Sequence, residues 1–289
     1  MIDLHTHSTC SDGSFTPEEL VAHAKKTNLR AIALTDHDSV SGIRQFIEAG
    51  RGMKLKTLGG LEISLEHNNS SLHLLGYLTD NENEKLCDAL LQIRDGRNER
   101  NRRIVAKLQE TGAKITMEEV EAEAGGEVVG RPHFAKVLVR NGAVMTRQEA
   151  FDVYLARGAK AYVERFRLSV KEGVGLVREA GGVPVLAHPN MCGCNDNAEL
   201  HQLLIDLIDG GLLGIEVWHS NHSDEETAQF LQLAKEFDLI ATGGSDFHGA
   251  MNPGVALGYG KGQLRVPDEA ADRLLEATTV DLAKCTNLG

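Results

Sequence analysis

The sequence predicts an α/β fold with a largely parallel sheet, either open or closed into a barrel. Short apolar runs alternate with amphipathic segments in the first third of the chain and again in the last third, and such strand–helix repeats are typical of parallel sheets. About seven of these runs have the length of a strand. With 289 residues the chain is long enough for one large α/β domain or two smaller ones.

The first third predicts four strands and two helices. Strands are expected at 1–5, 31–35, 55–66 and 71–78. Thr16 followed by Pro17 is typical of a helix N-cap and first helical position, so a helix begins there and runs to about Asn28. A second helix is expected at 41–50, and residues 67–70 predict a hairpin-like turn between the last two strands.

The middle of the chain has a different pattern. A long, charged helical stretch occupies residues 83–111, and shorter helical segments follow near 116–124, 132–141 and 146–156. No strong strand signal returns before about residue 183. We therefore expect the α/β domain to comprise residues 1–82 and 166–289, interrupted by a helical insertion at 83–165.

Strand–helix alternation then resumes in the last third. Strands are expected at 181–188, 212–219 and 239–248, the last with its exit loop. Helices are expected at 197–210, at 223–237 and near 267–277.

Charge and cysteine content exclude several classes of protein. The formal net charge of −12 argues against a general basic surface for nucleic acid. No apolar stretch approaches the roughly 20 residues that span a bilayer, and the N-terminus lacks a signal-peptide pattern, so we expect a cytoplasmic protein without membrane contact. The five scattered cysteines are interpreted as reduced thiols. Cys192 and Cys194 are too close for the usual zinc pair, and we favour a structural loop there.

Histidines follow the predicted strands with unusual regularity. Five strands each end in, or are directly followed by, a histidine, namely His5, His37, His188, His219 and His248. A sixth delivers Glu62. In a (β/α) barrel the carboxyl ends of the strands converge on one face, so these side chains would meet there.

A metal centre explains this repetition better than stability does. A single histidine after a strand is normally a structural residue, but polar groups at so many strand ends cost desolvation unless they have partners. Imidazoles combined with Asp12, Glu62 and Asp246 suit Mn²⁺ or Fe²⁺, which we favour, or Zn²⁺. His5 and His7 share one face of a strand, so they can hold one ion. Asp12 follows a turn in which we expect Gly13 to supply backbone freedom.

The motifs resemble those of the PHP (polymerase and histidinol phosphatase) family. The matching stretches are HTHSTCSDG (5–13), TDHDSVSG (35–42), GGLEIS (59–64), HLLGY (73–77), AHP (187–189) and GGSDFHG (243–249). They occur in the expected order over nearly the whole chain. The resemblance implies a distorted seven-stranded (β/α) barrel with a cluster of two or three divalent ions at the carboxyl end of the strands.

The resemblance also implies a ligand set of nine residues. For the first ion it gives His5, His7, Glu62 and Asp246. Glu62 would bridge to a second ion completed by His73 and His188. The third ion would be held by Asp12, His37 and His248.

The helical insertion resembles that of one branch of the family, the 3′,5′-nucleotide bisphosphate phosphatases and related 5′→3′ exoribonucleases. GRPHFAK (130–136) and GAKAYVER (158–165) carry this likeness. It implies that the insertion caps the substrate, with Arg131, His133 and Lys160 holding a phosphate. The alternative is that Arg131 and Lys160 are solvated charges and His133 a helix N-terminal residue.

The expected activity is therefore metal-dependent hydrolysis of nucleotide phosphomonoesters, chiefly the 3′-phosphate of 3′,5′-bisphosphates, and also cleavage of short RNA. His188, His219 and His222 are candidates for protonating the leaving oxygen. One alternative is a histidinol-phosphate or other sugar-phosphate phosphatase of the same family. Another is a non-catalytic metal-binding or regulatory protein, although such a protein would be expected to lack at least one ligand. The sequence carries no signal for an oligomeric state.

Overall fold

The computed structural model describes residues 1–67, 70–126 and 128–288. The chain divides into two compact units, one formed by Met1–Ala89 together with Leu168–Gly289 and the other by Leu90–Arg167. Helix α3 (Glu84–Glu110) begins in the first unit and continues into the second. The second unit therefore begins later than the insertion predicted from residue 83.

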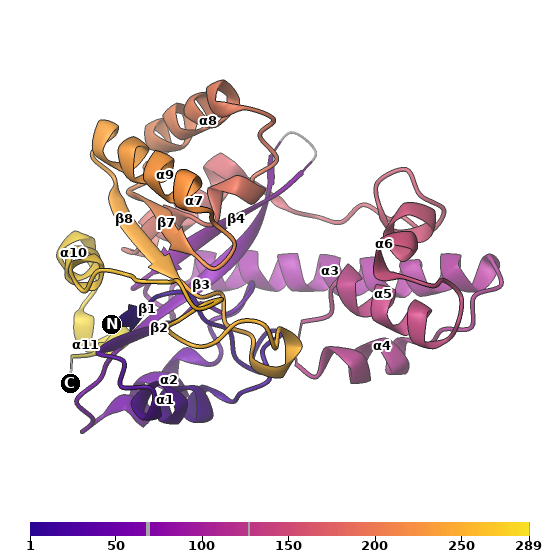
Figure 1. Ribbon diagram of the computed structural model, residues 1–289, viewed down its shortest axis with the longest axis horizontal. Coiled ribbons are helices and arrows are strands. Elements are labelled where there is room, and N and C mark those ends of the chain that lie inside the picture. Colours follow the sequence, from indigo (N-terminus) through magenta and orange to yellow (C-terminus); the bar gives the residue numbers. More distant parts are fainter. Residues whose placement is uncertain (68–69, 127, 289) are drawn as a thin grey trace. The chain divides into compact units, whose positions relative to one another are not determined.

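Seven strands of the first unit form one curved sheet in the order β1-β2-β3-β4-β6-β7-β8 (Figure 1). Their bounds are Ile2–Asp3, Ala31–Leu34, Lys56–His67, Ser70–Tyr77, Val183–Leu186, Gly214–His219 and Ile240–Gly244. The two ends of this order meet, because the amide of Leu4 donates to the carbonyl of Gly243 over 3.1 Å and that of His7 to Phe247 over 2.9 Å. The sheet is thus a nearly closed, distorted barrel of seven strands, which confirms the predicted fold class.

Strand β4 departs from a parallel sheet. It runs antiparallel to both of its neighbours, β3 and β6. A short connection between β3 and β4 cannot make the crossover that parallel pairing requires. Residues 68 and 69 of the predicted turn lie outside the described residues. The register places His73 opposite Ser64, on the same face of the pair as Glu62.

Two further strands are only two residues long and lie beside β3. Strand β5 (Leu168–Ser169) pairs parallel to its end, and β9 (Thr286–Asn287) pairs antiparallel to its start. Such short segments show no periodicity, so the sequence did not predict them.

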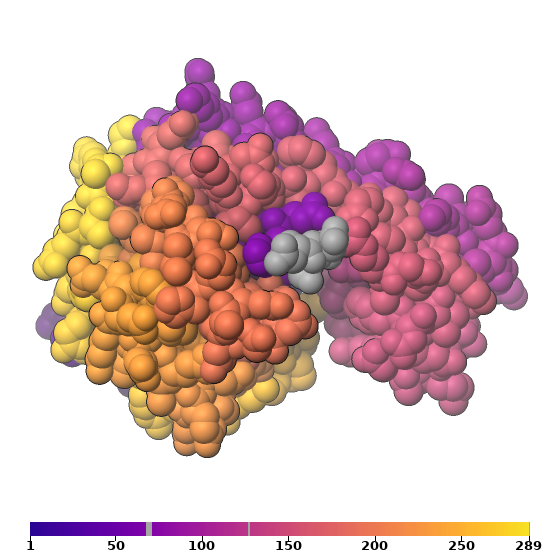
Figure 2. Space-filling model, turned by 90° about the horizontal axis from the view of Figure 1, so that it is seen from above, coloured from indigo at the N-terminus to yellow at the C-terminus, as the bar shows by residue number. Residues whose placement is uncertain are grey.

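Helices cover the outside of the barrel. Their bounds are Pro17–Lys26 (α1), Ile43–Gly50 (α2), Val170–Glu179 (α7), Asn197–Asp209 (α8), Asp224–Glu236 (α9), Glu269–Ala277 (α10) and Leu282–Cys285 (α11). Helices α1 and α2 lie on one side of the sheet and α7, α8 and α9 on the other (Figure 1). In the space-filling view, residues of α8 and α9, coloured orange, lie on the face of this unit that is turned to the viewer (Figure 2). Helix α1 begins as expected, since the Thr16 hydroxyl accepts from the amide of Glu19 over 3.2 Å and Pro17 is the first helical residue.

The second unit is helical and has its own apolar core. After α3 it contains α4 (Met117–Ala124), α5 (Arg131–Arg140), α6 (Arg147–Ala150) and a π-helical turn at Phe151–Leu155. Leu108, Phe134 and Leu138 are fully buried in its core. Within the described parts of the chain, no helix is both long and apolar enough to cross a membrane.

The barrel closure leaves no space for a side chain at Gly244. A Cβ there would overlap the backbone nitrogen and Cα of His5, which no flexible side chain can relieve. We predict that Gly244→Ala lowers the free energy of unfolding by about 3 kcal/mol or more. Gly175→Ala is the matched control, because a Cβ at that position in α7 meets nothing within 4 Å. It should raise stability by about 0.5–1 kcal/mol. Urea denaturation of both variants measures the difference, and a neutral Gly244→Ala would contradict the tight closure.

Candidate metal centre

The segments that directly follow the strands, here called the strand exits, form hydrogen bonds with one another. This pairing brings the histidines together. The amide of Asp246 donates to the carbonyl of His5 over 2.9 Å, which joins the exits of β1 and β8. His37 bridges to Glu62, and the amide of Ala187 donates to the carbonyl of His73 over 3.1 Å. Each side chain predicted at a strand end is therefore brought to the same end of the barrel.

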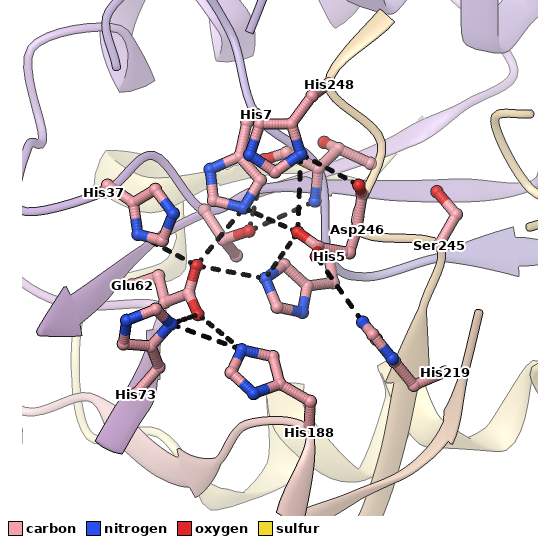
Figure 3. A network of polar contacts seen from close by, with 12 residues as sticks. His5, His7, His37, Glu62, His73, His188, His219, Ser245, Asp246 and His248 are labelled. Carbon is pink, nitrogen blue, oxygen red and sulfur yellow. Dashed lines mark hydrogen bonds and ion pairs between the residues drawn. The ribbon is translucent and has the colours of Figure 1, made fainter. Parts of the chain in front are cut away.

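Five histidines surround the carboxylate of Glu62 (Figure 3). Glu62 is fully buried. Its Oε2 lies 3.3 Å from His5 Nε2, 3.2 Å from His7 Nε2 and 3.1 Å from His37 Nδ1. Its Oε1 lies 2.8 Å from His73 Nδ1 and 3.0 Å from His188 Nε2.

Two aspartates extend this cluster. Asp246 Oδ1 is 3.2 Å from His7 Nε2 and 3.5 Å from His5 Nε2. Asp12 Oδ1 is 3.3 Å from His248 Nε2, and its Oδ2 is 3.9 Å from His37 Nε2. The structure thus brings together all nine residues that the resemblance implied as ligands.

Several sets within the cluster have donor atoms close enough to share one ion. One set is His5, His7, Glu62 and Asp246, which matches the implied first-ion set. Another is Asp12, His37 and His248 with His7 added, and a third joins Glu62 and His73 to His37. His37 and His7 thereby take part in more than one set.

Unsatisfied polar atoms in the cluster fit the presence of cations. Both ring nitrogens of His7, together with His37 Nδ1 and Asp12 Oδ1, are buried without a hydrogen-bond partner. His7 Nε2 lies 3.2 Å from both Glu62 Oε2 and Asp246 Oδ1, and its Nδ1 lies 3.9 Å from Asp12 Oδ1, so potential metal donors face one another. Buried polar groups are normally satisfied, so these atoms need an explanation, and divalent ions supply one.

The electrostatics of the cluster favour positive charge at its centre. Burial raises the pKa of the Glu62 carboxyl, but the neighbouring His37, His73 and His5 outweigh it and hold that pKa well below its usual value. Burial lowers the pKa of His5, but Glu216, Glu62 and Asp246 overcome this and raise it well above the ordinary value. The carboxylates therefore remain ionised and attract cations.

Gly13 is required for a different reason from the one expected. Its backbone does not adopt a positive φ. A Cβ on Gly13 would instead overlap the carbonyl of His7, because the loop carrying Asp12 folds back tightly onto the first strand.

The same loop is anchored by Asp36, which is buried beneath it. The Asp36 carboxylate accepts from the amide and hydroxyl of Ser8, both over 2.7 Å, and from the hydroxyl of Ser11 over 2.6 Å. These bonds fix the turn that presents Asp12.

Two residues of the cluster adopt a backbone conformation rare for non-glycine residues. The φ angle is 25° at His188 and 57° at Asp246. Such conformations cost free energy and persist where the surroundings over-determine them, often at functional sites.

His219 and His222 have different environments. His219 Nε2 is 3.6 Å from Asp246 Oδ2, so this ring borders the cluster. His222 donates from Nδ1 to the carbonyl of Val217 over 2.9 Å and packs against Phe230. His222 is therefore held toward its own strand.

The residues expected to bind substrate lie in the second unit. Arg131 begins α5 and donates to the carbonyl of Leu155 over 3.2 Å. His133 Nδ1 accepts from the amide of Gly130 over 3.0 Å and so caps the start of the helix. This contact agrees with the alternative interpretation of His133 as a helix N-terminal residue. Lys160 is exposed, with its ammonium 5.9 Å from the centre of the Tyr154 ring.

Sequence reasoning missed an arginine cluster around Arg131. Arg100 is only 5% exposed, and its Nε has no hydrogen-bond partner. Burial lowers its pKa to about 9, assisted by the charges of Arg97, Arg131 and Arg167. The sequence places Arg97 and Arg100 in the long charged helix, where arginine side chains are normally solvated. Only the fold of this unit shows that both are buried.

Other buried carboxylates were also missed, among them Asp3, Asp36 and Glu216. Each lies within or at the end of an apolar strand, where an ionised group needs partners. That pattern was the available signal.

All five cysteines are free thiols. The sulfurs of Cys192 and Cys194 lie 3.2 Å apart, and burial raises the pKa of Cys194 to about 12. A thiol with this pKa stays protonated at neutral pH.

A barrel with a buried histidine–carboxylate cluster at its strand exits defines a class of hydrolases that depend on divalent metal ions. The family model of the PHP domain matches residues 3–165 of this chain. A 3′,5′-nucleoside bisphosphate phosphatase of Chromobacterium violaceum is 33% identical over 259 residues, which cover 89% of this chain and 90% of that protein. The 5′-3′ exoribonuclease Rnm of Escherichia coli is 33% identical over 248 residues, covering 85% of this chain and 84% of the enzyme.

A solved structure from Bifidobacterium adolescentis, assigned by inference as a metal-dependent phosphoesterase, superimposes with a TM-score of 0.83 at 33% identity, covering 98% of this chain and 97% of the other. The chain belongs to the PHP family. It is a hydrolase of phosphoric ester bonds, as the motifs predicted.

Proposed function

We propose that this phosphoesterase removes the 3′-phosphate from 3′,5′-nucleotide bisphosphates, using two or three divalent ions. The cluster around Glu62 carries the proposal, because it offers more histidine and carboxylate donors than one ion can take. Mn²⁺ and Fe²⁺ suit this donor set best, and Zn²⁺ is the alternative.

The nine residues of the cluster would hold the ions. When bound, such ions neutralise phosphate charge and lower the pKa of a water molecule. The chain's own contribution is to orient the donors and to place a proton near the leaving oxygen.

His219 is the best candidate for holding that proton. Its Nδ1 accepts from the amide of Asn221 over 3.2 Å, so in the neutral ring the proton sits on Nε2. That nitrogen faces Asp246 at the edge of the cluster. His188, whose Nε2 faces Glu62, is better suited as a ligand, and His222 is held by its own strand.

The arginine cluster supports a substrate with a second phosphate. Arg100 and Arg131 bring guanidinium groups close together in the second unit, where the charges of Arg97, Arg131 and Arg167 help to lower the pKa of Arg100. Guanidinium groups bind phosphate with paired, charge-assisted hydrogen bonds. We propose that Arg131, with Arg100, binds the 5′-phosphate and that His133 and Lys160 support it.

The direct test is phosphate release from adenosine 3′,5′-bisphosphate by the chain loaded with Mn²⁺. We expect release of one phosphate and formation of the 5′-monophosphate. Preferential hydrolysis of histidinol phosphate or another sugar phosphate would refute the nucleotide assignment. Bound metal without turnover of any phosphate ester would refute catalysis.

Short RNA is a second candidate substrate, favoured by the likeness to the exoribonuclease of E. coli. A 5′-phosphorylated oligoribonucleotide assayed beside the bisphosphate separates the two. Stepwise release of 5′-mononucleotides, at a kcat/KM comparable to that for the bisphosphate, would show that the chain also degrades short RNA.

Arg131→Ala is predicted to reduce kcat/KM for the bisphosphate by about 10- to 100-fold, the loss expected for one charge-assisted phosphate contact. Turnover of 4-nitrophenyl phosphate, which has one phosphate, should change far less. Arg147→Ala is the control, since this exposed arginine lies in the same unit outside the arginine cluster. Equal losses on both substrates would remove the anchoring role of Arg131.

A further inference from the structure

Glu216 is a fully buried carboxylate in the middle of β7. Its Oε1 lies 2.9 Å from His5 Nδ1. Its Oε2 accepts from the backbone amide of His188 over 2.7 Å. One side chain therefore contacts the segments that follow two strands of the barrel, β1 and β6.

The first contact determines which nitrogen of His5 carries a proton. An ionised carboxylate can only accept a hydrogen bond, so Nδ1 must donate. In the neutral ring, Nε2 then keeps its lone pair for a metal ion. It lies 3.3 Å from Glu62 Oε2 and 3.5 Å from Asp246 Oδ1, which are donors of the same set. A histidine that binds a metal through one nitrogen normally donates from the other in this way.

The second contact supports an unfavourable backbone conformation. His188 has a φ of 25°, which places its ring with Nε2 3.0 Å from Glu62 Oε1. Its amide hydrogen bond to Glu216 helps to hold this conformation against the strain.

A role for Glu216 as a ligand of a further ion fits less well. His5, Glu216 and His219 are close enough to form a set of donors. However, both oxygens of Glu216 already accept hydrogen bonds, and His219 Nδ1 accepts from Asn221. The proton of neutral His219 then occupies Nε2, and that nitrogen cannot bind a metal.

We infer that Glu216 is a positioning residue, which fixes the tautomer of His5 and the backbone of His188 so that both rings present Nε2 to the ions. This inference rests on the divalent-ion centre of the proposed function. It assigns to β7 the task of aligning ligands from β1 and β6.

The test measures Mn²⁺ binding to the metal-depleted chain by titration and counts the bound ions by elemental analysis. Glu216→Gln retains an acceptor for one contact but presents an NH₂ group to the other donor. We expect Mn²⁺ affinity to fall by about 10- to 100-fold with the number of ions at saturation unchanged. Glu216→Asp keeps the charge with a shorter reach and should lie between Glu216→Gln and wild type.

Tyr77→Phe is the matched control. Tyr77 is fully buried, and its hydroxyl donates to the carbonyl of Leu4 over 2.8 Å and also interacts with the side chain of Thr242, so its hydrogen bonding is with the barrel wall. It should lower thermal stability but leave Mn²⁺ affinity unchanged.

Wild-type affinity in both Glu216 variants would overturn the inference. Loss of one ion at saturation, with the others bound normally, would also overturn it by making Glu216 a ligand. If the wild-type chain bound no Mn²⁺, Fe²⁺ or Zn²⁺, the proposed centre itself would fail.

Discussion

Replacing Glu62 by glutamine should reduce phosphate release by more than about 100-fold, beyond the loss typical of residues that only support a ligand. Glu62 contacts five histidines through its two oxygens, and two of the four donor sets of the cluster include it. An amide in its place removes the negative charge and presents hydrogen-bond donors to ring nitrogens. Steady-state phosphate release and elemental analysis of the purified variant measure the two effects.

The control for this variant is Glu66→Gln. Glu66 lies four residues along the same strand, on the same face, and pairs with Ser71 away from the cluster. It should retain wild-type activity and metal content. Glu62→Gln with full activity and full metal content would refute the cluster as the catalytic centre. We expect His7→Ala and Asp246→Ala to lose phosphate release and bound metal as Glu62→Gln does.

The strand exits explain why so much of the site could be predicted from the sequence. In a barrel the carboxyl ends of the strands meet at one end, so a histidine after each strand implies a cluster without knowledge of the exact register. His5, His37, His188 and His248 were found in this way. His73 was different, since it comes from an antiparallel strand and reaches Glu62 only through the β3–β4 register.

The parts that could not be predicted depend on burial that only the fold creates. Glu216 is one carboxylate among many in an acidic chain until β7 encloses it. Arg100 belongs to a strongly charged helix, which on its own reads as a solvated surface. The short strands β5 and β9 are paired through long-range contacts with β3, and two residues carry no periodic signal.

The distribution of charge reconciles an acidic chain with an anionic substrate. The net charge of −12 would repel a nucleotide bisphosphate over most of the surface. Two local features reverse that sign. The carboxylates of the cluster attract divalent ions, and the second unit gathers Arg97, Arg100, Arg131 and Arg167. The binding that we propose for a bisphosphate should therefore depend on both features, and Arg131→Ala tests the second one by comparing substrates with one and two phosphates.

Removing the metal ions should abolish activity and also lower the melting temperature. A ligand that binds only the folded chain at about 100 times its Kd contributes roughly 2.7 kcal/mol, and a domain of this size loses about 5–10 °C when that is removed. Without cations, the fully buried carboxylate of Glu62 and the partly buried ones of Asp246 and Asp12 depend on the neighbouring histidines alone to offset their desolvation. Dialysis against a chelator, followed by thermal denaturation and phosphate-release assays, measures both losses.

Re-addition of single metals then shows which ions restore function. Mn²⁺, or Fe²⁺ under anaerobic conditions, should recover activity and melting temperature together, because both depend on the same donor atoms. The chelator should shift the melting temperature of Glu62→Gln much less than that of wild type, since that variant has fewer ions to lose. Full activity in a chain that elemental analysis shows to be metal-free would contradict the metal centre. A melting temperature that recovers without activity would indicate instead that the ions support the barrel and not the reaction.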